Sequence, residues 1–205
     1  MTISYEYGSA LYVNLTNRCD CACVFCIRLN GSGGSIYTDN LWLEREPTVE
    51  EAVNDILSRD LSKYGELVFC GFGEPTYRFD DIVAVTKALR EKLGEKMPRV
   101  RINTNGHGNL INGRDITPEL AGVIDALSVS LNAPDREKYL AVTVPSGGEK
   151  AYDAMLSFTR DAAKYVPDVQ MTVVDRDLSV EEIARCREIT DSLGVRLRVR
   201  EYIEE

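Results

Sequence analysis

The stretch Leu11-Tyr-Val-Asn-Leu-Thr-Asn-Arg-Cys-Asp-Cys-Ala-Cys-Val-Phe-Cys26 joins an apolar run to three cysteines, Cys19, Cys23 and Cys26, spaced for one short loop. Iron–sulfur clusters normally take four cysteine thiolates, so three thiolates on one loop would leave one iron without a protein ligand. An open coordination position lets a substrate or cofactor bind a metal. The stretch therefore predicts chemistry at an exposed iron. A structural zinc site is the alternative, but it usually needs a second pair of cysteines or histidines, and the sequence has none.

Composition indicates a globular protein with a substantial core. The chain has 205 residues, of which 44% are apolar and 28% charged, and we expect one domain over residues 1–205. No run of about 18 apolar residues predicts a membrane span, and the first residues lack the pattern of a signal peptide. We therefore expect a cytoplasmic protein, in which reduced thiols bind metal more often than they form disulfides.

Charge and histidine content argue against several functions. The net charge is −9 and the isoelectric point about 4.8, which disfavours autonomous binding to a phosphate backbone. His107 is the only histidine. A Ser–His–Asp hydrolase or a histidine-rich zinc site would have to depend on that residue alone, which argues against both.

Apolar runs alternate with helical patterns, which predicts βα units and a parallel sheet. The expected strands cover 11–15, 66–70, 100–103, 126–131, 169–174 and 196–200, with the chain ending its last strand at 201–203. Several of them are expected to be apolar on both faces. Because the chain is short for a closed eight-unit barrel of about 250 residues, we predict an α/β fold with a partial (β/α)6 barrel.

Helix boundaries are readable from capping patterns. Thr48-Val-Glu-Glu51 and Ser179-Val-Glu-Glu182 match capping boxes, which predict helices to about residues 60 and 193. A helix beginning at Asp80 should end at Gly94, and Thr117-Pro118 should open another. A further helix is expected over 149–165, and the glycine-rich stretch 31–35 should form a loop.

A second motif, Cys70-Gly-Phe-Gly-Glu-Pro-Thr76, follows the second predicted strand. Gly71 and Gly73 would let the backbone approach a ligand closely, and Pro75 stiffens the turn. The Glu74 carboxylate would suit a ligand ammonium group. Such a sequence by itself is also compatible with an ordinary tight turn. Because reacting groups gather at the carboxyl ends of barrel strands, its place next to the cysteines favours a ligand site.

These two motifs together resemble the radical S-adenosylmethionine (SAM) superfamily. The resemblance implies a 4Fe–4S cluster on Cys19, Cys23 and Cys26, with SAM chelating the fourth iron. Its turn usually reads Gly-Gly-Glu, and here Phe72 stands in place of one glycine. Since the contacts implied are mainly backbone carbonyls and Glu74, that change is tolerable.

The resemblance extends to residues that would contact SAM. It places Phe25 near the adenine, Asn105 of Thr104-Asn105-Gly106 in the pocket, and a polar group of the fourth strand on the ribose or the carboxylate. Ser128, Ser130 and Asn132 alternate along that strand and should share a face; Ser130 and Asn132 are our candidates. The glycine-rich adenine motif that the superfamily carries on strand five is absent.

The sequence allows two interpretations for several polar residues. Arg198 and Arg200 share a face of the last strand, and one of them, Arg200, is assigned to the pocket, with a solvated edge charge as the alternative. His107 is either a solvated loop residue or a substrate contact. Cys21 is interpreted as a bystander, and Cys70 as either a pocket residue or a buried thiol.

Over nearly the whole chain the sequence is similar to the small TatD-associated radical SAM proteins, a name that assigns no substrate. The resemblance implies reductive cleavage of SAM to a 5′-deoxyadenosyl radical, which removes hydrogen from a substrate, most simply a small molecule. It also implies an electron donor of the flavodoxin or ferredoxin type. The alternatives are an activase that makes a glycyl radical on a partner enzyme and a non-catalytic metal-binding interaction module.

Overall fold

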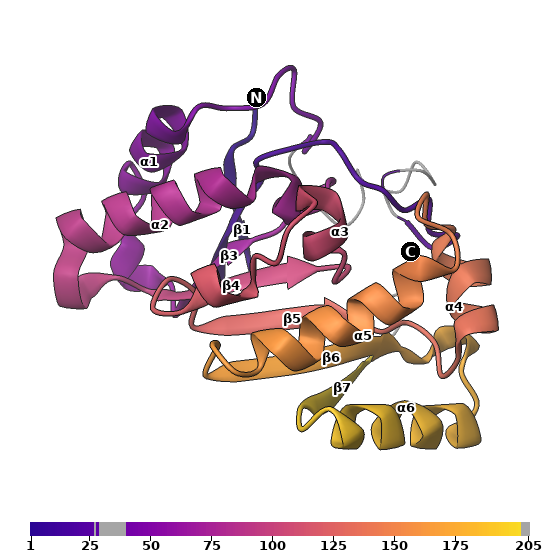
Figure 1. Ribbon diagram of the computed structural model, residues 1–205. Helices are drawn as coiled ribbons and strands as arrows, with labels where there is room; N and C mark the ends of the chain where they lie inside the picture. Colours follow the sequence, from indigo (N-terminus) through magenta and orange to yellow (C-terminus); the bar gives the residue numbers. More distant parts are fainter. Residues whose placement is uncertain (27, 29–39, 202–205) are drawn as a thin grey trace.

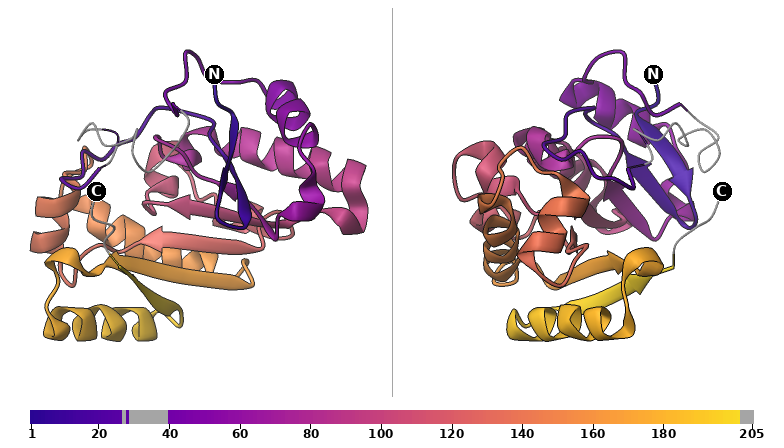
Figure 2. Two further views of the ribbon diagram at one scale, coloured as in Figure 1. Left: turned by 180° about the vertical axis from the view of Figure 1, so that it is seen from behind. Right: turned by 90° about the vertical axis from the view of Figure 1, so that its right-hand side faces the viewer.

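The computed structural model describes residues 1–26, 28 and 40–201. Within them, seven strands form one sheet in the order β1-β2-β3-β4-β5-β6-β7. All pairs from β2 to β7 are parallel, and β1 runs antiparallel to β2. The strands form an arc with helices along its outer side (Figure 1, Figure 2). This arrangement confirms the predicted α/β partial barrel.

Each of the six predicted strands corresponds to a strand of the structure. The strands are β1 (Ser4–Tyr7), β2 (Ala10–Val13), β3 (Glu66–Phe69), β4 (Arg99–Thr104), β5 (Ala126–Ser130), β6 (Asp168–Val174) and β7 (Arg196–Arg200). The α-helices are α1 (Val49–Leu57), α2 (Phe79–Leu93), α3 (Gly108–Asn112), α4 (Arg136–Thr143), α5 (Lys150–Ala162) and α6 (Val180–Ser192). Short 3-10 helices are η2 (Leu61–Lys63), η3 (Pro75–Arg78), η4 (Gly94–Lys96), η5 (Thr117–Leu120) and η6 (Asp175–Asp177). The predicted loop 31–35 and the predicted strand end at residues 202 and 203 lie outside the described residues.

The predicted helix signals are confirmed in their geometry. At the start of α1, the Glu51 backbone N–H donates to Thr48 Oγ1 at 3.2 Å, and the Thr48 N–H donates to the Glu51 carboxylate at 2.8 Å. Ser179 and Glu182 form the same box at α6. Gly94 ends α2 with a φ of 54°, a conformation that glycine adopts without strain.

Several elements differ from the sequence-based expectation. The hairpin of β1 and β2, which turns at Gly8, was not predicted, because four mainly polar residues carry little strand signal. Helix α4 was also missed, although Asp135 caps it by accepting from the Lys138 N–H. The helix predicted at Thr117 is a single 3-10 turn whose N-cap is Ile116. None of the described helices is long and apolar enough to cross a membrane.

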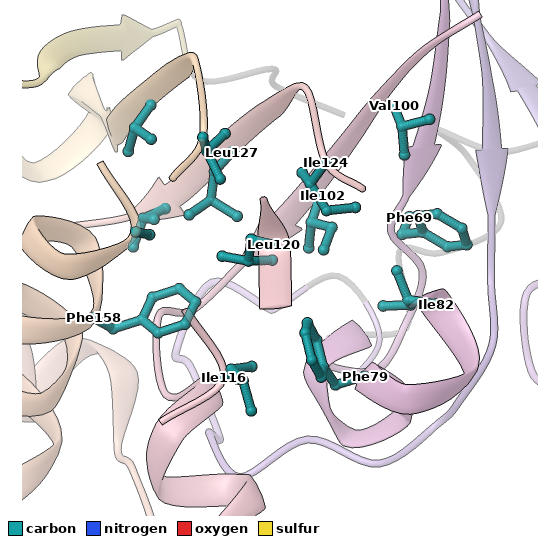
Figure 3. Packing of buried hydrophobic residues seen from close by; sticks show 14 of the residues in the cluster. Phe69, Phe79, Ile82, Val100, Ile102, Ile116, Leu120, Ile124, Leu127 and Phe158 are labelled. Carbon is teal, nitrogen blue, oxygen red and sulfur yellow. The ribbon is translucent and has the colours of Figure 1, made fainter. Parts of the chain in front are cut away.

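The two faces of the sheet have opposite chemistry, which corrects the expectation of strands apolar on both faces. The outer face packs against the helices as one hydrophobic core, with Phe69, Ile102 and Leu127 facing Phe79 and Phe158 (Figure 3). Strand register places the alternate residues on the inner face. The polar members of that face are Tyr12, Glu66, Arg99, Arg101, Asn103, Ser128, Ser130, Asp168, Gln170, Thr172, Arg196, Arg198 and Arg200.

Adjacent residues of β5 test this division. Leu127→Ala, on the outer face, should lower the free energy of unfolding by about 2–5 kcal/mol because it leaves a cavity in the core. Ser128→Ala, on the inner face, should change it by less than about 1 kcal/mol, since the hydroxyl has only a long contact with Gln170. Urea unfolding followed by circular dichroism measures both, and equal losses would contradict the assignment of faces.

Candidate functional site

The cysteine loop, residues 19–26, follows the carboxyl end of β2. Backbone hydrogen bonds attach it to the end of α4 and the residues after it: Ala22 N–H donates to Thr143 O at 3.1 Å, and Val24 N–H to Val142 O at 3.0 Å. Cys21 also forms an isolated bridge with Pro145, and Figure 1 shows the two segments side by side. Helix α4, which the sequence did not predict, therefore supports the loop that carries the predicted metal ligands.

The predicted cluster ligands are free thiols on this loop. Cys19, Cys23 and Cys26 are half-buried free thiols, and Cys21 is a buried one. The Cys21 backbone N–H donates to Cys19 Sγ at 3.5 Å, and the neighbouring Cys21 thiol lowers the pKa of Cys19 and of Cys23 despite their burial. Thiolates are the metal-binding form of cysteine. Cys21 is thus in contact with Cys19, and its exclusion from the ligand set stays a prediction.

A buried chain of side chains, Asp20–His107–Tyr139, lies behind the cysteine loop. His107 Nδ1 is 2.7 Å from Asp20 Oδ2, and His107 Nε2 is 2.8 Å from the Tyr139 hydroxyl. The His107 side chain is fully buried, so the expectation of a solvated loop histidine is wrong. Burial raises the pKa of Asp20, but hydrogen bonds from His107 and Asn105 outweigh it and hold that pKa below its usual value. Together, Asp20, Cys21 and His107 are also a set of donors that could hold a metal ion.

Asn105 connects the cysteine loop to the turn after β3. Its amide Nδ2 donates to Asp20 Oδ1 at 2.6 Å, and its backbone N–H donates to Glu74 Oε2 at 2.7 Å. Arg28 makes a second connection, because its guanidinium donates to the carbonyls of Cys21 and Phe72. The sequence motif placed Asn105 in the pocket, but it gave no signal that Asn105 would bridge two loops.

The glycine turn, residues 71–75, packs directly on the backbone that leads into the cysteine loop. A Cβ on Gly71 would lie 2.0 Å from Asn14 Oδ1, and one on Gly73 would lie 2.3 Å from Thr16 O. The Glu74 N–H donates to Arg18 O at 2.8 Å. The space that these glycines leave is therefore filled by the protein itself, which corrects the reason given for them from the sequence. Phe72 is buried and contacts Trp42 edge to face.

Glu74 is the buried carboxylate of the turn, and its oxygens accept four hydrogen bonds. The donors are Thr76 N–H, Thr76 Oγ1 and Thr104 Oγ1 at 2.7–3.0 Å, in addition to Asn105 N–H. Burial nevertheless raises the pKa of Glu74. Among the described residues no lysine or arginine forms an ion pair with Glu74, so its charge lacks a counter-ion. All four hydrogen bonds come from the protein, and the contact of Glu74 with a ligand ammonium group stays a prediction. Pro75 begins η3, for which Glu74 is the N-cap.

The other predicted site residues are Phe25, Ser130, Asn132 and Arg200. Phe25 lies half-buried in the turn before Cys26. Ser130 is the last residue of β5, whereas Asn132 lies beyond the strand with a φ of 61°. The expectation that Asn132 continues the alternation of Ser128 and Ser130 is therefore wrong. Arg200 is close enough to Cys70 to lower that thiol's pKa, although burial raises it more strongly.

Comparisons with known proteins show the family to which the chain belongs. The family profile described as Radical SAM superfamily matches residues 13–188. The GTP 3′,8-cyclase of Corynebacterium glutamicum (strain R) is 35% identical over 138 residues, which cover 65% of this chain and 33% of the cyclase. The probable dual-specificity RNA methyltransferase RlmN 1 of Protochlamydia amoebophila is 22% identical over 98% of this chain and 54% of its own length.

A solved structure shows the same fold. Streptococcus suis SuiB bound to S-adenosylmethionine superposes with a TM-score of 0.68 at 16% identity, over 97% of this chain and 42% of SuiB. The chain thus spans between a third and about half of the length of these three proteins.

The Asp20–His107–Tyr139 chain generates a graded prediction for stability. Tyr139→Phe leaves His107 Nε2 buried without a partner and should cost about 1–3 kcal/mol in the free energy of unfolding. His107→Ala also removes a partner of the Asp20 carboxylate and should cost more, about 3–5 kcal/mol. Tyr165→Phe, at a partly exposed tyrosine, is the control. Chemical denaturation of the apo proteins measures the series, and losses equal to that of the control would contradict it.

Proposed function

The chain belongs to the radical SAM superfamily of enzymes, and from this premise we propose that it binds a 4Fe–4S cluster and SAM and removes hydrogen from a small-molecule substrate. In this proposal Cys19, Cys23 and Cys26 hold the cluster, and the glycine turn holds SAM. The observation that carries it is the direct attachment of the turn to the cysteine loop, through the hydrogen bond from Glu74 N–H to Arg18 O and the bridge through Asn105.

When bound, these groups would supply a one-electron reductive cleavage of the C5′–S bond of SAM and a 5′-deoxyadenosyl radical that takes hydrogen from the substrate. The protein provides position and orientation. The Cys21 thiol favours the thiolate forms of Cys19 and Cys23. Glu74, a buried carboxylate without a counter-ion among the described residues, would orient the SAM ammonium group. Phe25 would pack near the adenine.

The inner face of the sheet is the candidate place for the rest of SAM and for the substrate. Ser130 lies at the carboxyl end of β5 on that face, and we assign it to the ribose or carboxylate of SAM together with Asn132. Arg200, at the end of β7, would contact an anionic group. An external reductant of the flavodoxin or ferredoxin type is required, since the cluster needs an electron for each cleavage.

The names of two relatives and the net charge of the chain indicate the substrate class. One relative is named for GTP and another for RNA, and the net charge of −9 favours a small molecule over RNA. Neither the structure nor the relatives favour the activase or the interaction module. Membership of the TatD-associated group, a single domain over residues 1–205 and a cytoplasmic location remain part of the proposal.

Anaerobic reconstitution tests the cluster assignment. The wild-type protein should bind iron and sulfide and, with a strong reductant and SAM, release 5′-deoxyadenosine. Cys19→Ser, Cys23→Ser and Cys26→Ser should each lose most of the iron, because each removes one of three protein ligands. Cys186→Ala, in α6, should retain it. Purified wild-type protein that contains zinc alone, or a reduced and loaded sample that releases no 5′-deoxyadenosine, would contradict the proposal.

A second variant separates SAM binding from cluster binding. Glu74→Gln removes the negative charge and places an amide N–H₂ where one oxygen accepts from a backbone N–H. We expect iron content to be retained and SAM affinity to fall by about tenfold or more, since hydrogen bonds to charged groups contribute about 1.5–3 kcal/mol. Equilibrium dialysis with labelled SAM measures the affinity, with Glu119→Gln as the exposed control. Unchanged SAM binding in Glu74→Gln would remove Glu74 from the assigned site.

A further inference from the structure

We propose that the inner face of the sheet holds a binding site for the phosphate group of a small-molecule substrate, centred on Arg101 and Arg198. The inference rests on the radical SAM function proposed above and names the substrate class of that site. It is motivated by a cavity of about 230 Å³ that opens on the inner face. Its charged and polar walls come from β3, β4, β6 and β7 and include Glu66, Arg101, Asp168, Gln170, Arg196 and Arg198.

The cavity is positively charged in a chain that is strongly acidic. Four arginines line it, Arg99 being the fourth, against the two carboxylates Glu66 and Asp168, which gives a local surplus of two positive charges (4 − 2 = 2). The chain as a whole carries a net charge of −9. A phosphate monoester carries about −1.5 to −2 at neutral pH, so its charge matches the local surplus.

Two of the guanidinium groups have donors that the protein does not use. Arg101 pairs with Glu66 at 3.0 Å, yet its Nε is buried and has no hydrogen-bond partner among the described residues. Arg28 and Arg90 also have a buried Nε without a hydrogen-bond partner among the described residues, but neither of them lines the cavity. Arg198 forms no ion pair or hydrogen bond within the part of the chain that the structure describes. Arg99 and Arg196, in contrast, both pair with Asp168.

The cavity lies at the amino ends of the strands, because Glu66, Asp168 and Arg196 are the first residues of β3, β6 and β7, whereas the glycine turn follows the carboxyl end of β3. Arg101 and Thr104 are three residues apart on β4. The Thr104 hydroxyl donates a hydrogen bond to Glu74. At about 3.3 Å per residue, the two positions are separated by about 10 Å along the strand. The positive charges of Arg101 and Arg200 both work to lower the pKa of the Cys70 thiol, although burial raises it more strongly. Cys70 immediately precedes the glycine turn. A phosphorylated molecule anchored at Arg101 would therefore have to extend about 10 Å along β4 to reach the level of the glycine turn.

The cavity favours a phosphorylated small molecule over two other anions. Guanidinium groups bind both carboxylates and phosphates in forks, but a single carboxylate would leave one positive charge of the surplus unmatched. A nucleic-acid backbone needs an extended basic surface, whereas this basic cavity is local and the chain as a whole carries a net charge of −9.

Calorimetric titration of the apo full-length chain with glycerol 3-phosphate tests the site without cluster or SAM. We expect saturable binding that weakens by about tenfold in Arg198→Gln, the loss expected when one charge-assisted contact is removed. Arg198→Lys should recover only part of it, since an ammonium group keeps the charge without the fork. Arg101→Gln should weaken binding as well. Arg114→Gln is the matched control, because Arg114 pairs with Asp80 and Glu119, which do not line the cavity.

The outcomes separate the possibilities. No saturable binding, or an equal loss in Arg198→Gln and Arg114→Gln, would overturn the site. Citrate binding as tightly as glycerol 3-phosphate would overturn the assignment to phosphate. A single-stranded RNA that binds more tightly and displaces glycerol 3-phosphate would overturn the assignment to a small molecule. If glycerol 3-phosphate binds as expected while the loaded wild-type enzyme releases no 5′-deoxyadenosine, the phosphate site stands and the proposed radical SAM reaction fails.

Discussion

The buried Glu74 carboxylate holds the ends of neighbouring strands in one arrangement. It follows β3, accepts hydrogen bonds from Thr104 and Asn105 after β4, and its own backbone N–H donates to Arg18 in the loop after β2. Burying a carboxylate is costly unless it is hydrogen-bonded. These hydrogen bonds therefore stabilise the conformation of the turn that carries Glu74. Because the cysteine loop begins at Cys19, one residue after Arg18, the same contacts determine where the predicted cluster ligands lie.

The cysteine loop is held on its other side by elements from the second half of the chain. The Asp20–His107–Tyr139 chain ties it to the start of α3 and to α4, and backbone hydrogen bonds connect it to the residues that end α4. Two independent supports on opposite sides reduce the conformations open to a loop that must present three sulfurs together. We infer that this arrangement prepares the loop for the cluster.

The inner face of the sheet gives the partial barrel its chemical character. Helices cover only the outer face, so the inner face is free to carry polar groups such as Asn103, Ser128 and Gln170. In the proposed function, this face receives the substrate. The arginines of β4 and β7 then determine which charge such a substrate would carry.

The sequence by itself determined the order of the six parallel strands, the two capping boxes and the spacing of Cys19, Cys23 and Cys26, because periodicity, capping and short spacing are local properties of a chain. Only the tertiary structure decided that His107 is buried and that Asn105 bridges two loops. It also decided that Gly71 and Gly73 make room for Asn14 and Thr16. The support that α4 gives to the cysteine loop is likewise visible only there. Each of these depends on contacts between segments far apart in the chain, which leave no periodic pattern in the sequence. The same reason explains why the sequence analysis expected several strands to be apolar on both faces, whereas the packing of the helices on one face left the other face polar.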